Sequence, residues 1–360
     1  MTAALALARR GLGSVWPNPA VGCVILCDGV VAGRGWTQPG GRPHAETEAL
    51  GRAGAAARGA TAYVSLEPCN HHGKTPPCSE ALIAAGIRRC VVACEDPDPR
   101  VSGSGVARLR AAGIAVETGV LANEARALNQ GFFLRVEHRR PLVTLKLATS
   151  LDGRIATHTG HSQWITGATA RAWGHGLRAS HDAILIGNGT AQADDPELTC
   201  RLPGLARRSP VRVVADSHLS LSLTSKLARG ARDIPLWIAC RSDADRARIA
   251  AFGACGAELL TIDSGAPGTI GAPALLAALA DRGITRVLVE GGSRLAGSLL
   301  RDRLVDRLEW FRAPRLIGGD GLAAVAAFGV DTLEIATTFD CVGVRRAGDD
   351  LWESFVRRNT

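Results

Sequence analysis

The sequence contains few aromatic residues, and its basic residues do not cluster. Phe, Trp and Tyr together make up 4% of the 360 residues, and Tyr occurs once. Proteins that bind single-stranded nucleic acid stack bases on aromatic side chains along a basic groove. Here the basic runs, such as Arg139-Arg140 and Arg207-Arg208, are short and scattered. We therefore expect no nucleic-acid partner.

Lysine is also scarce, occurring only at positions 74, 146 and 226, so arginine carries most of the net charge of +8. A positive balance of this kind is compatible with phosphorylated small molecules as well as with nucleic acid. A genome biased toward arginine codons would produce the same balance, so the charge alone leaves these explanations open.

Long apolar runs are absent as well. No stretch approaches the roughly eighteen apolar residues of a membrane span, and the first charges, Arg9 and Arg10, follow a short apolar run instead of preceding it as in a secretory signal. We expect a cytoplasmic protein without a membrane partner. Ten cysteines in such a chain argue against a disulfide scaffold. The pairs Cys23/Cys27 and Cys90/Cys94 are expected to be buried hydrophobes, with a second metal site as the alternative.

Strand-like and helix-like segments alternate along the chain, which predicts sheets covered by helices on both faces. In the first third, Thr61–Leu66 is typical of a buried strand, and Glu46–Arg58 and Ser79–Ala85 are typical of helices. The pattern restarts at Pro141, so we expect one domain over residues 1–140 and a second over residues 141–360.

Two less regular segments complete the predicted secondary structure. Gly131–Arg140 is expected to be a charged connection between the domains. In the tail, Leu308–Phe311 and Thr332–Thr338 are expected to be antiparallel strands.

The most specific chemical signal combines His44-Ala45-Glu46 with Cys69 and Cys78. One imidazole and two thiolates make three zinc ligands, which leaves the fourth tetrahedral position open, as in a catalytic site. An H-x-E motif followed by P-C is the signature of zinc nucleobase deaminases, in which the Glu moves protons and does not bind the metal. Because residues two apart on a helix point in opposite directions, His44 must lie at the helix start.

One detail departs from this signature, because eight residues separate Cys69 from Cys78 where C-x-x-C is expected. A reduced structural cysteine pair beside a surface histidine is the alternative interpretation of the motif. At the level of function, a nucleic-acid or nucleoside base deaminase with an accessory nucleotide-binding domain and a non-catalytic zinc-stabilised module also stay open.

Glycine turns mark the second domain. Val287–Val289 followed by Glu290-Gly291-Gly292-Ser293 has the order strand, glycine turn, helix start, which presents free N–H groups to a phosphate. The pattern is not G-x-G-x-x-G, so a simple tight turn is equally open. Gly187-Asn188-Gly189 is weaker still, and Asp194-Asp195 fits either a metal pair or a turn before Pro196.

The chain resembles the bifunctional riboflavin-biosynthesis deaminase/reductase family over its whole length. In the first half the matching segments are Pro17–Gly22, His44–Glu46, Leu66–Cys69, Thr75–Cys78 and Asn129–Phe133. In the second half they are Lys146–Ala148, Ser150–Gly153, Ser162–Thr166, Asp194–Pro196 and Glu290–Gly292. The long spacing between the two cysteines is the spacing that this family uses.

The resemblance implies an α/β protein with an N-terminal cytidine-deaminase-like α/β/α domain and a C-terminal dihydrofolate-reductase-like α/β domain. The first would use Zn²⁺ to deaminate a diaminopyrimidinone that carries a phosphoribosylamino group. The second would use NADPH to reduce the ribosyl group to a ribityl chain. The partner is then a phosphorylated aminopyrimidine, and we expect a homo-oligomer.

The resemblance also assigns residues to sites. Glu46 would be catalytic, His44, Cys69 and Cys78 would bind zinc, and Asn18, His71 and Lys74 would bind the deaminase substrate. NADPH would contact Ala148, Trp164, Thr190, Asp194, Ser217, Gly292, Ser293, Arg294, Leu295, Ala296, Gly297 and Ser298. The reductase substrate would contact Ser162, Arg178, Leu198, Arg201 and Glu290. Lys146 and Asp194 are candidates for the acid of the reduction.

Overall fold

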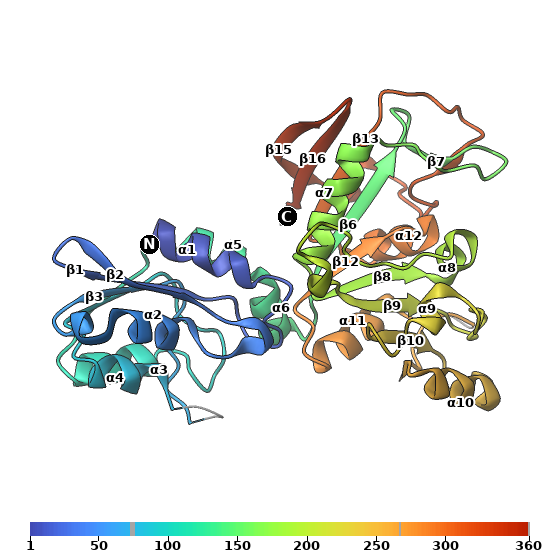
Figure 1. Cartoon of the computed structure of the whole chain (residues 1–360). Helices are drawn as coiled ribbons and strands as arrows, with labels where there is room; N and C mark the ends of the chain where they lie inside the picture. Colours follow the sequence, from blue (N-terminus) through green and yellow to red (C-terminus); the bar gives the residue numbers. More distant parts are fainter. Residues whose placement is uncertain (73–75, 266–267, 359–360) are drawn as a thin grey trace. The chain divides into compact units, whose positions relative to one another are not determined.

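The computed structural model describes residues 1–72, 76–265 and 268–358. The chain forms two compact units, Met1–Arg139 and Arg140–Thr360 (Figure 1). Each unit has its own mixed sheet and its own hydrophobic core.

Unit 1 is built on a five-stranded sheet with the order β2-β1-β3-β4-β5. Strand β1 is antiparallel to β2 and β3, whereas β3, β4 and β5 are parallel. The strands are β1 (Gly22–Cys27), β2 (Val30–Trp36), β3 (Thr61–Val64), β4 (Arg89–Val92) and β5 (Ala115–Thr118). The helices are α1 (Thr2–Ala8), α2 (Ala45–Ala53), α3 (Cys78–Ala84), α4 (Ser104–Ala111), α5 (Ala122–Leu128) and α6 (Gln130–His138).

Glycines in the strands allow the helices of unit 1 to pack closely on the sheet. A Cβ added at Gly22 would lie 1.9 Å from the carbonyl oxygen of Ala4 in α1, and one at Gly35 would lie 2.1 Å from that of Ala45 in α2. Gly22 faces Trp36 in the pairing of β1 with β2, and neighbouring strand residues point to opposite faces. Helices α1 and α2 therefore cover opposite faces of the sheet (Figure 1).

The expected connection Gly131–Arg140 was wrong, because α6 occupies Gln130–His138. Phe132 and Phe133 are buried in the core of unit 1, and Val136 packs against it. Glu137 and His138 lie on the exposed side of the helix, and such polar residues obscure its apolar face in the sequence.

Unit 2 is built on a nine-stranded sheet with the order β11-β10-β9-β8-β12-β6-β13-β16-β15. Its strands are β6 (Leu142–Thr149), β8 (Ala183–Gly187), β9 (Val211–Ala215), β10 (Leu236–Cys240), β11 (Glu258–Thr261), β12 (Arg286–Glu290), β13 (Arg307–Arg312), β15 (Phe339–Ala347) and β16 (Asp350–Arg357). Strands β7 (Arg154–Ala156) and β14 (Leu322–Ala323) form a separate two-stranded sheet. The helices are α7 (Ala168–Ala179), α8 (Asn188–Asp194), α9 (Lys226–Arg229), α10 (Arg246–Cys255), α11 (Ala272–Asp281) and α12 (Ser293–Arg301).

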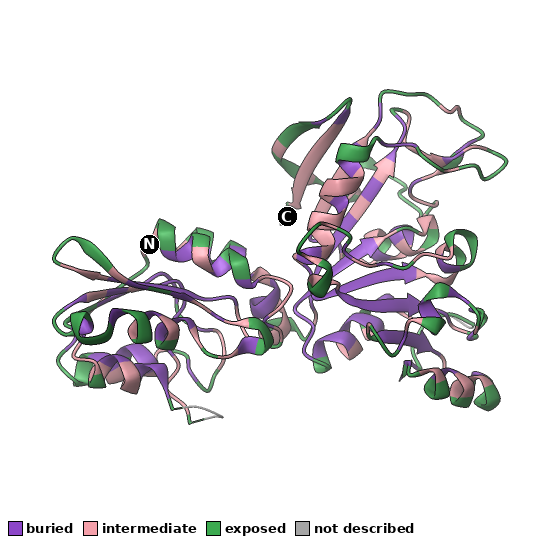
Figure 2. Cartoon of the chain, in the orientation of Figure 1, coloured by how far each residue is buried: buried purple, intermediate pink, exposed green. Residues whose placement is uncertain are grey.

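The strands from β11 to β13 are parallel, and β16 and β15 extend the sheet in antiparallel fashion. The central strands of the sheet are buried, whereas β15 at its edge is largely exposed (Figure 2). Because the parallel strands end at one edge, the loops and helices that follow β6, β8 and β12 lie together there, where ligands bind in open α/β sheets.

The expected strand Thr332–Thr338 was also wrong. That segment contains a short 3₁₀ helix, Leu333–Ile335, and the antiparallel strands of the tail are β15 and β16. Leu333 is 86% exposed, so the apolar residues that suggested a strand do not face a core. Strand β13 pairs with β16 in antiparallel fashion but with β6 in parallel.

We predict that the close approach at Gly35 contributes to stability. Gly35→Ala should lower the free energy of unfolding by about 1–3 kcal/mol, because the added methyl group meets backbone that cannot move independently. Gly51→Ala is the matched control, because Gly51 lies inside α2 with open space around a Cβ and should gain about 0.5–1 kcal/mol of helix propensity. Urea unfolding of the full-length protein measures both changes, and equal midpoints would contradict this account of the packing.

Candidate functional site

The zinc-ligand residues of unit 1 lie together. Nδ1 of His44 is 3.3 Å from Sγ of Cys78 and 3.6 Å from Sγ of Cys69, and the three ligand atoms lie within 4.8 Å of one another. Atoms bound tetrahedrally to one zinc at about 2.0–2.3 Å would be about 3.5–3.8 Å apart. The donor set and its spacing therefore fit this ion.

The ends of helices and strands hold these three residues. His44 is the N-cap of α2 and has an extended backbone, with φ −71° and ψ 161°, as its spacing from Glu46 requires. Cys69 lies in the segment after β3, and Cys78 is the first residue of α3. The backbone N–H of Cys78 points at Sγ of Cys69 from 3.4 Å, so the start of α3 favours a thiolate there.

The environment shifts the proton affinities of the cluster. A hydrogen bond from Cys78, aided by His44, lowers the pKa of Cys69 to about 4. The same contact raises the pKa of Cys78. Glu46 is 3% exposed, and burial raises its pKa to about 7, with Cys69 contributing. A carboxyl group poised near neutral pH is suited to take up a proton and return it.

The structure describes two of the three residues expected to bind the deaminase substrate, and each has its own contacts. Nδ2 of Asn18 donates to the carbonyl oxygen of Gly41 at 3.2 Å, close to the segment that leads to His44. Nδ1 of His71 is buried and has no hydrogen-bond partner among the described residues. Lys74 lies outside the described residues.

The other paired cysteines of unit 1 do not form a metal cluster. Cys23, Cys90 and Cys94 are buried in its core, and Cys27 is partly exposed beside Asp28. Among residues 1–72, 76–265 and 268–358, His44, Cys69 and Cys78 are the one group of three or more His, Cys, Asp or Glu residues with metal-ligand spacing.

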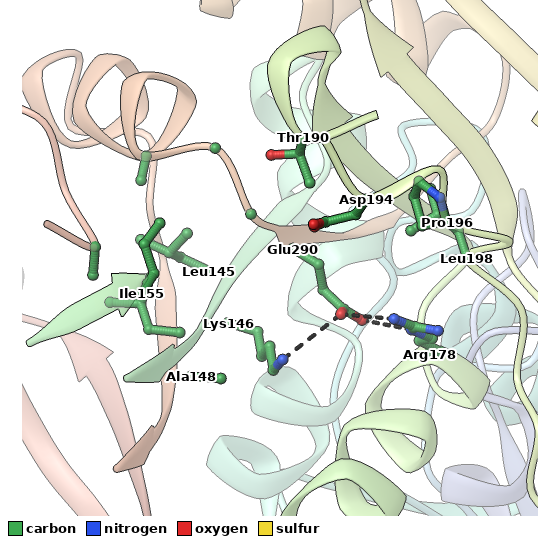
Figure 3. A pocket seen from close by; sticks show the side chains of 15 residues that line it. Leu145, Lys146, Ala148, Ile155, Arg178, Thr190, Asp194, Pro196, Leu198 and Glu290 are labelled. Atoms are coloured by element: carbon green, nitrogen blue, oxygen red, sulfur yellow. Dashed lines mark hydrogen bonds and ion pairs between the residues drawn. The ribbon is translucent and has the colours of Figure 1, made fainter. Parts of the chain in front are cut away.

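Unit 2 has a cavity of about 240 Å³ at the carboxyl edge of its sheet (Figure 3). Eight residues expected to bind ligands are part of its lining. They are Ala148, Arg178, Thr190, Asp194, Leu198, Glu290, Gly292 and Ala296. Strands β6 and β12 and helices α7, α8 and α12 supply most of them.

A buried charge cluster forms one wall of this cavity. Arg178 donates to Glu290 from Nε at 2.7 Å and from Nη2 at 2.9 Å, and Nζ of Lys146 is 3.8 Å from the same carboxylate. Burial alone would raise the pKa of Glu290, but Arg178 and Lys146 lower it to about 2. Burial lowers the pKa of Lys146, so this ammonium group releases a proton more readily than usual.

The turn after β12 lets a ligand approach the backbone. Gly291 and Gly292 have φ values of 88° and 91°, which side chains disfavour. A Cβ on Gly291 would lie 3.0 Å from Thr190, and helix α12 starts at Ser293 without a side-chain cap. Open N–H groups beside glycine fit a phosphate, so this turn suits a dinucleotide.

The other residues expected to bind NADPH or the reductase substrate mostly do not line this cavity. Trp164 is 58% exposed beneath the guanidinium of Arg171, and Arg201 pairs with Glu197 at 3.5 Å. The carbonyl oxygen of Ser217 accepts from the N–H of Arg241. The residues from Ser293 to Ser298 lie in α12, where Ala296 lines the cavity and Gly297 packs against Ala326. The structure gives no contact that assigns Ser162 or Arg294.

The sequence did not predict several residues that line the cavity, nor His175, which lies beside it through Thr199. Leu145, Ile155 and Ala324 line the cavity, and Nδ1 of His175 lies 3.1 Å from the carbonyl oxygen of Thr199, which Arg178 also contacts. The apolar residues carry no signal beyond their strand composition. His175 lies three residues before Arg178, one helical turn away in α7, which is the one clue that the sequence offers.

Two family models together match most of the chain. The model of the RibD C-terminal domain matches residues 141–352. The model of the cytidine and deoxycytidylate deaminase zinc-binding region matches residues 1–94, which include His44, Cys69 and Cys78.

Known proteins resemble the chain over nearly its whole length. It is 44% identical to the riboflavin biosynthesis protein RibD of Bacillus amyloliquefaciens over 320 residues, which cover 89% of this chain and 85% of that protein. It is 41% identical to RibD of Escherichia coli strain K12, covering 98% of this chain and 96% of the relative. The chain belongs to the RibD family. It is accordingly a bifunctional enzyme of riboflavin biosynthesis with deaminase and reductase activities.

Solved RibD structures share the fold. Acinetobacter baumannii RibD, form 1, superposes with a TM-score of 0.89 at 37% identity, covering 99% of this chain and 98% of that chain. A Thermotoga maritima protein, a diaminohydroxyphosphoribosylaminopyrimidine deaminase and 5-amino-6-(5-phosphoribosylamino)uracil reductase, gives a TM-score of 0.86 at 35% identity, covering 99% and 97%. These RibD relatives support the bifunctional enzyme and give no support to a nucleic-acid deaminase. No helix in the described part of the chain has the length and apolar character needed to cross a membrane.

We predict that the Arg178–Glu290 pair stabilises unit 2 in a pH-dependent manner. Arg178→Ala should lower the free energy of unfolding at pH 7 by about 3 kcal/mol, because it leaves Glu290 buried with a weaker partner. Since the folded pKa of Glu290, about 2, is below its unfolded value, its contribution is present above about pH 4.5 and is lost as the pH falls toward 2. The difference between wild type and variant should shrink over that window in urea titrations.

The control for this prediction is Arg282→Ala, which removes an exposed pair with Glu258 and should cost less than about 1 kcal/mol. Equal losses for the two variants, or a difference that does not change between pH 7 and pH 3, would contradict the assigned role of the buried pair.

Proposed function

We propose that unit 1 deaminates 2,5-diamino-6-(5-phosphoribosylamino)pyrimidin-4-one at a zinc ion held by His44, Cys69 and Cys78. The observation that carries the proposal is the convergence of these three ligand atoms within 4.8 Å, beside the buried carboxyl group of Glu46. Three ligands leave one tetrahedral position for water, and zinc, when bound there, supplies the Lewis acidity that activates it.

In the proposed reaction, each of these residues of unit 1 has a separate role. Glu46 takes a proton from the attacking water and delivers it to the departing ammonia. The pKa of about 7 that burial gives its carboxyl group suits both transfers. His71 and Asn18 would orient the substrate, with the buried Nδ1 of His71 available for a hydrogen bond. By family resemblance, Lys74 would contact the phosphate.

Unit 2 would reduce the ribosyl group of the deaminated pyrimidine to a ribityl chain. NADPH, when bound, supplies the hydride. The glycine turn Gly291-Gly292 and the start of α12 would hold its phosphates, with Thr190 and Asp194 beside them. Arg178 and Glu290 would bind the substrate, and Lys146 would be the group from which a proton moves to the opened sugar.

We further propose that the enzyme acts on small molecules in the cytoplasm as a homo-oligomer. All ten cysteines are free thiols, as in proteins of reducing compartments. The homo-oligomer is proposed from the resemblance to the family.

The proposal for unit 1 is tested with Glu46→Gln in the full-length protein. This variant should keep about one zinc per chain and lose deamination by a factor of about 10² to 10⁴, because general acid–base catalysis is removed. Reduction of the deaminated pyrimidine by NADPH should be unchanged. Metal analysis and product chromatography give the three readouts.

The matched control is Glu48→Gln, two residues farther along α2, where the carboxylate pairs with Arg52 at 3.0 Å. It should deaminate like wild type. If Glu46→Gln deaminated at the wild-type rate, or if His44→Ala kept both zinc and deamination, the assignment of this site would be wrong.

A further inference from the structure

Glu67 is a buried carboxylate that the proposed chemistry does not use. It follows β3, precedes the zinc-ligand residue Cys69 by two positions, and is 3% exposed. Burying a charge is costly unless it is hydrogen-bonded. The contacts of Glu67 therefore show what the carboxylate is for.

Four backbone N–H groups donate to this carboxylate, and all belong to the segment Asp96–Val106. Oε2 accepts from Asp96 at 3.2 Å and from Gly103 at 2.9 Å. Oε1 accepts from Gly105 at 2.9 Å and from Val106 at 3.1 Å. Gly105 and Val106 lie in the first turn of α4, where the helix dipole favours a negative charge.

The same segments touch at a second point. A Cβ added at Gly105 would lie 2.0 Å from the carbonyl oxygen of Pro68, the residue between Glu67 and Cys69. The N–H of Glu67 also donates to the carbonyl oxygen of Cys94 at 3.0 Å. Glu67 and Pro68, which lead to Cys69, are therefore held against Asp96–Val106 by both the backbone and the side chain of Glu67.

Asp96–Val106 also lies near residues of the proposed deaminase site. Arg100, with a contribution from His71, lowers the pKa of Asp98, which places Asp98 within electrostatic reach of that imidazole. Asp96 is 7% exposed, and its N–H donates to Glu67, two residues before Cys69. Through the hydrogen bonds of Glu67 and the approach of Gly105 to Pro68, the segment packs directly against the residues that precede Cys69.

We propose that Glu67 is a positioning residue for deamination, which fixes the segment that carries Cys69 and His71 against Asp96–Val106. The proposal rests on the deaminase function proposed for unit 1. Glu67 itself would transfer no proton and bind no metal. Its removal should weaken substrate binding more than it slows the chemical step.

The test is Glu67→Gln in the full-length, zinc-loaded protein. The amide nitrogen would face N–H groups, so two of the four hydrogen bonds are lost. We expect the KM for the phosphoribosylamino-pyrimidine to rise about tenfold or more with a smaller change in kcat, at unchanged zinc content and reductase activity. Backbone amides of Gly103, Gly105 and Val106 should exchange hydrogen faster.

Two further variants sharpen the test. Glu80→Gln is the matched control, because Glu80 also ties α4 to its neighbour through Arg108 at 2.7 Å, but on the exposed surface; it should leave KM and exchange unchanged. Gly105→Ala should reproduce the rise in KM by pushing the two segments apart while keeping the carboxylate.

The outcomes separate the two proposals. A Glu67→Gln enzyme with wild-type KM and wild-type exchange would overturn the positioning role, as would loss of zinc with a fall in kcat at constant KM. A wild-type protein that bound zinc but did not deaminate the pyrimidine would instead contradict the function proposed for unit 1.

Discussion

The close packing of α2 on β2 positions the zinc-ligand residue His44 and the carboxyl group of Glu46. Gly33 and Gly35 leave room for the backbone of α2, whose carbonyl oxygens at Ala49 and Ala45 would lie 2.1 Å from any added Cβ. The helix therefore starts against the sheet, with His44 as its N-cap and Glu46 in the buried first turn. Were the helix farther away, Glu46 would be solvated, and its pKa would lie near the usual value of about 4.3.

The pKa values of the buried carboxyl groups Glu46 in unit 1 and Glu290 in unit 2 are shifted in opposite directions. In unit 1 burial dominates, so the pKa of Glu46 rises to about 7 and its proton is exchangeable at neutral pH. In unit 2 the charges of Arg178 and Lys146 dominate, so the pKa of Glu290 falls to about 2. The first arrangement suits proton transfer, whereas the second suits a fixed anion that orients its neighbours.

Local chemistry can be predicted from the sequence of this chain. The residue types and spacing of His44, Glu46, Cys69 and Cys78 were sufficient to predict a three-ligand cluster at helix and strand ends. Contacts between distant residues were out of reach, because Arg178 and Glu290 are 112 positions apart and each alone resembles a surface residue. The partners of Glu67 and the helix at Gln130–His138 were missed for the same reason, since only tertiary packing distinguishes them from loops.

The central claim is that one chain carries out two successive reactions, deamination and then reduction. Product mass, measured on the phosphoribosylamino-pyrimidine with and without NADPH, tests it most directly. Without NADPH the product should be heavier by about one mass unit, as replacement of NH by O requires. With NADPH it should gain about two more, as hydride transfer and protonation require. A gain of two units that precedes deamination, or no change in mass with zinc-loaded protein, would contradict the account.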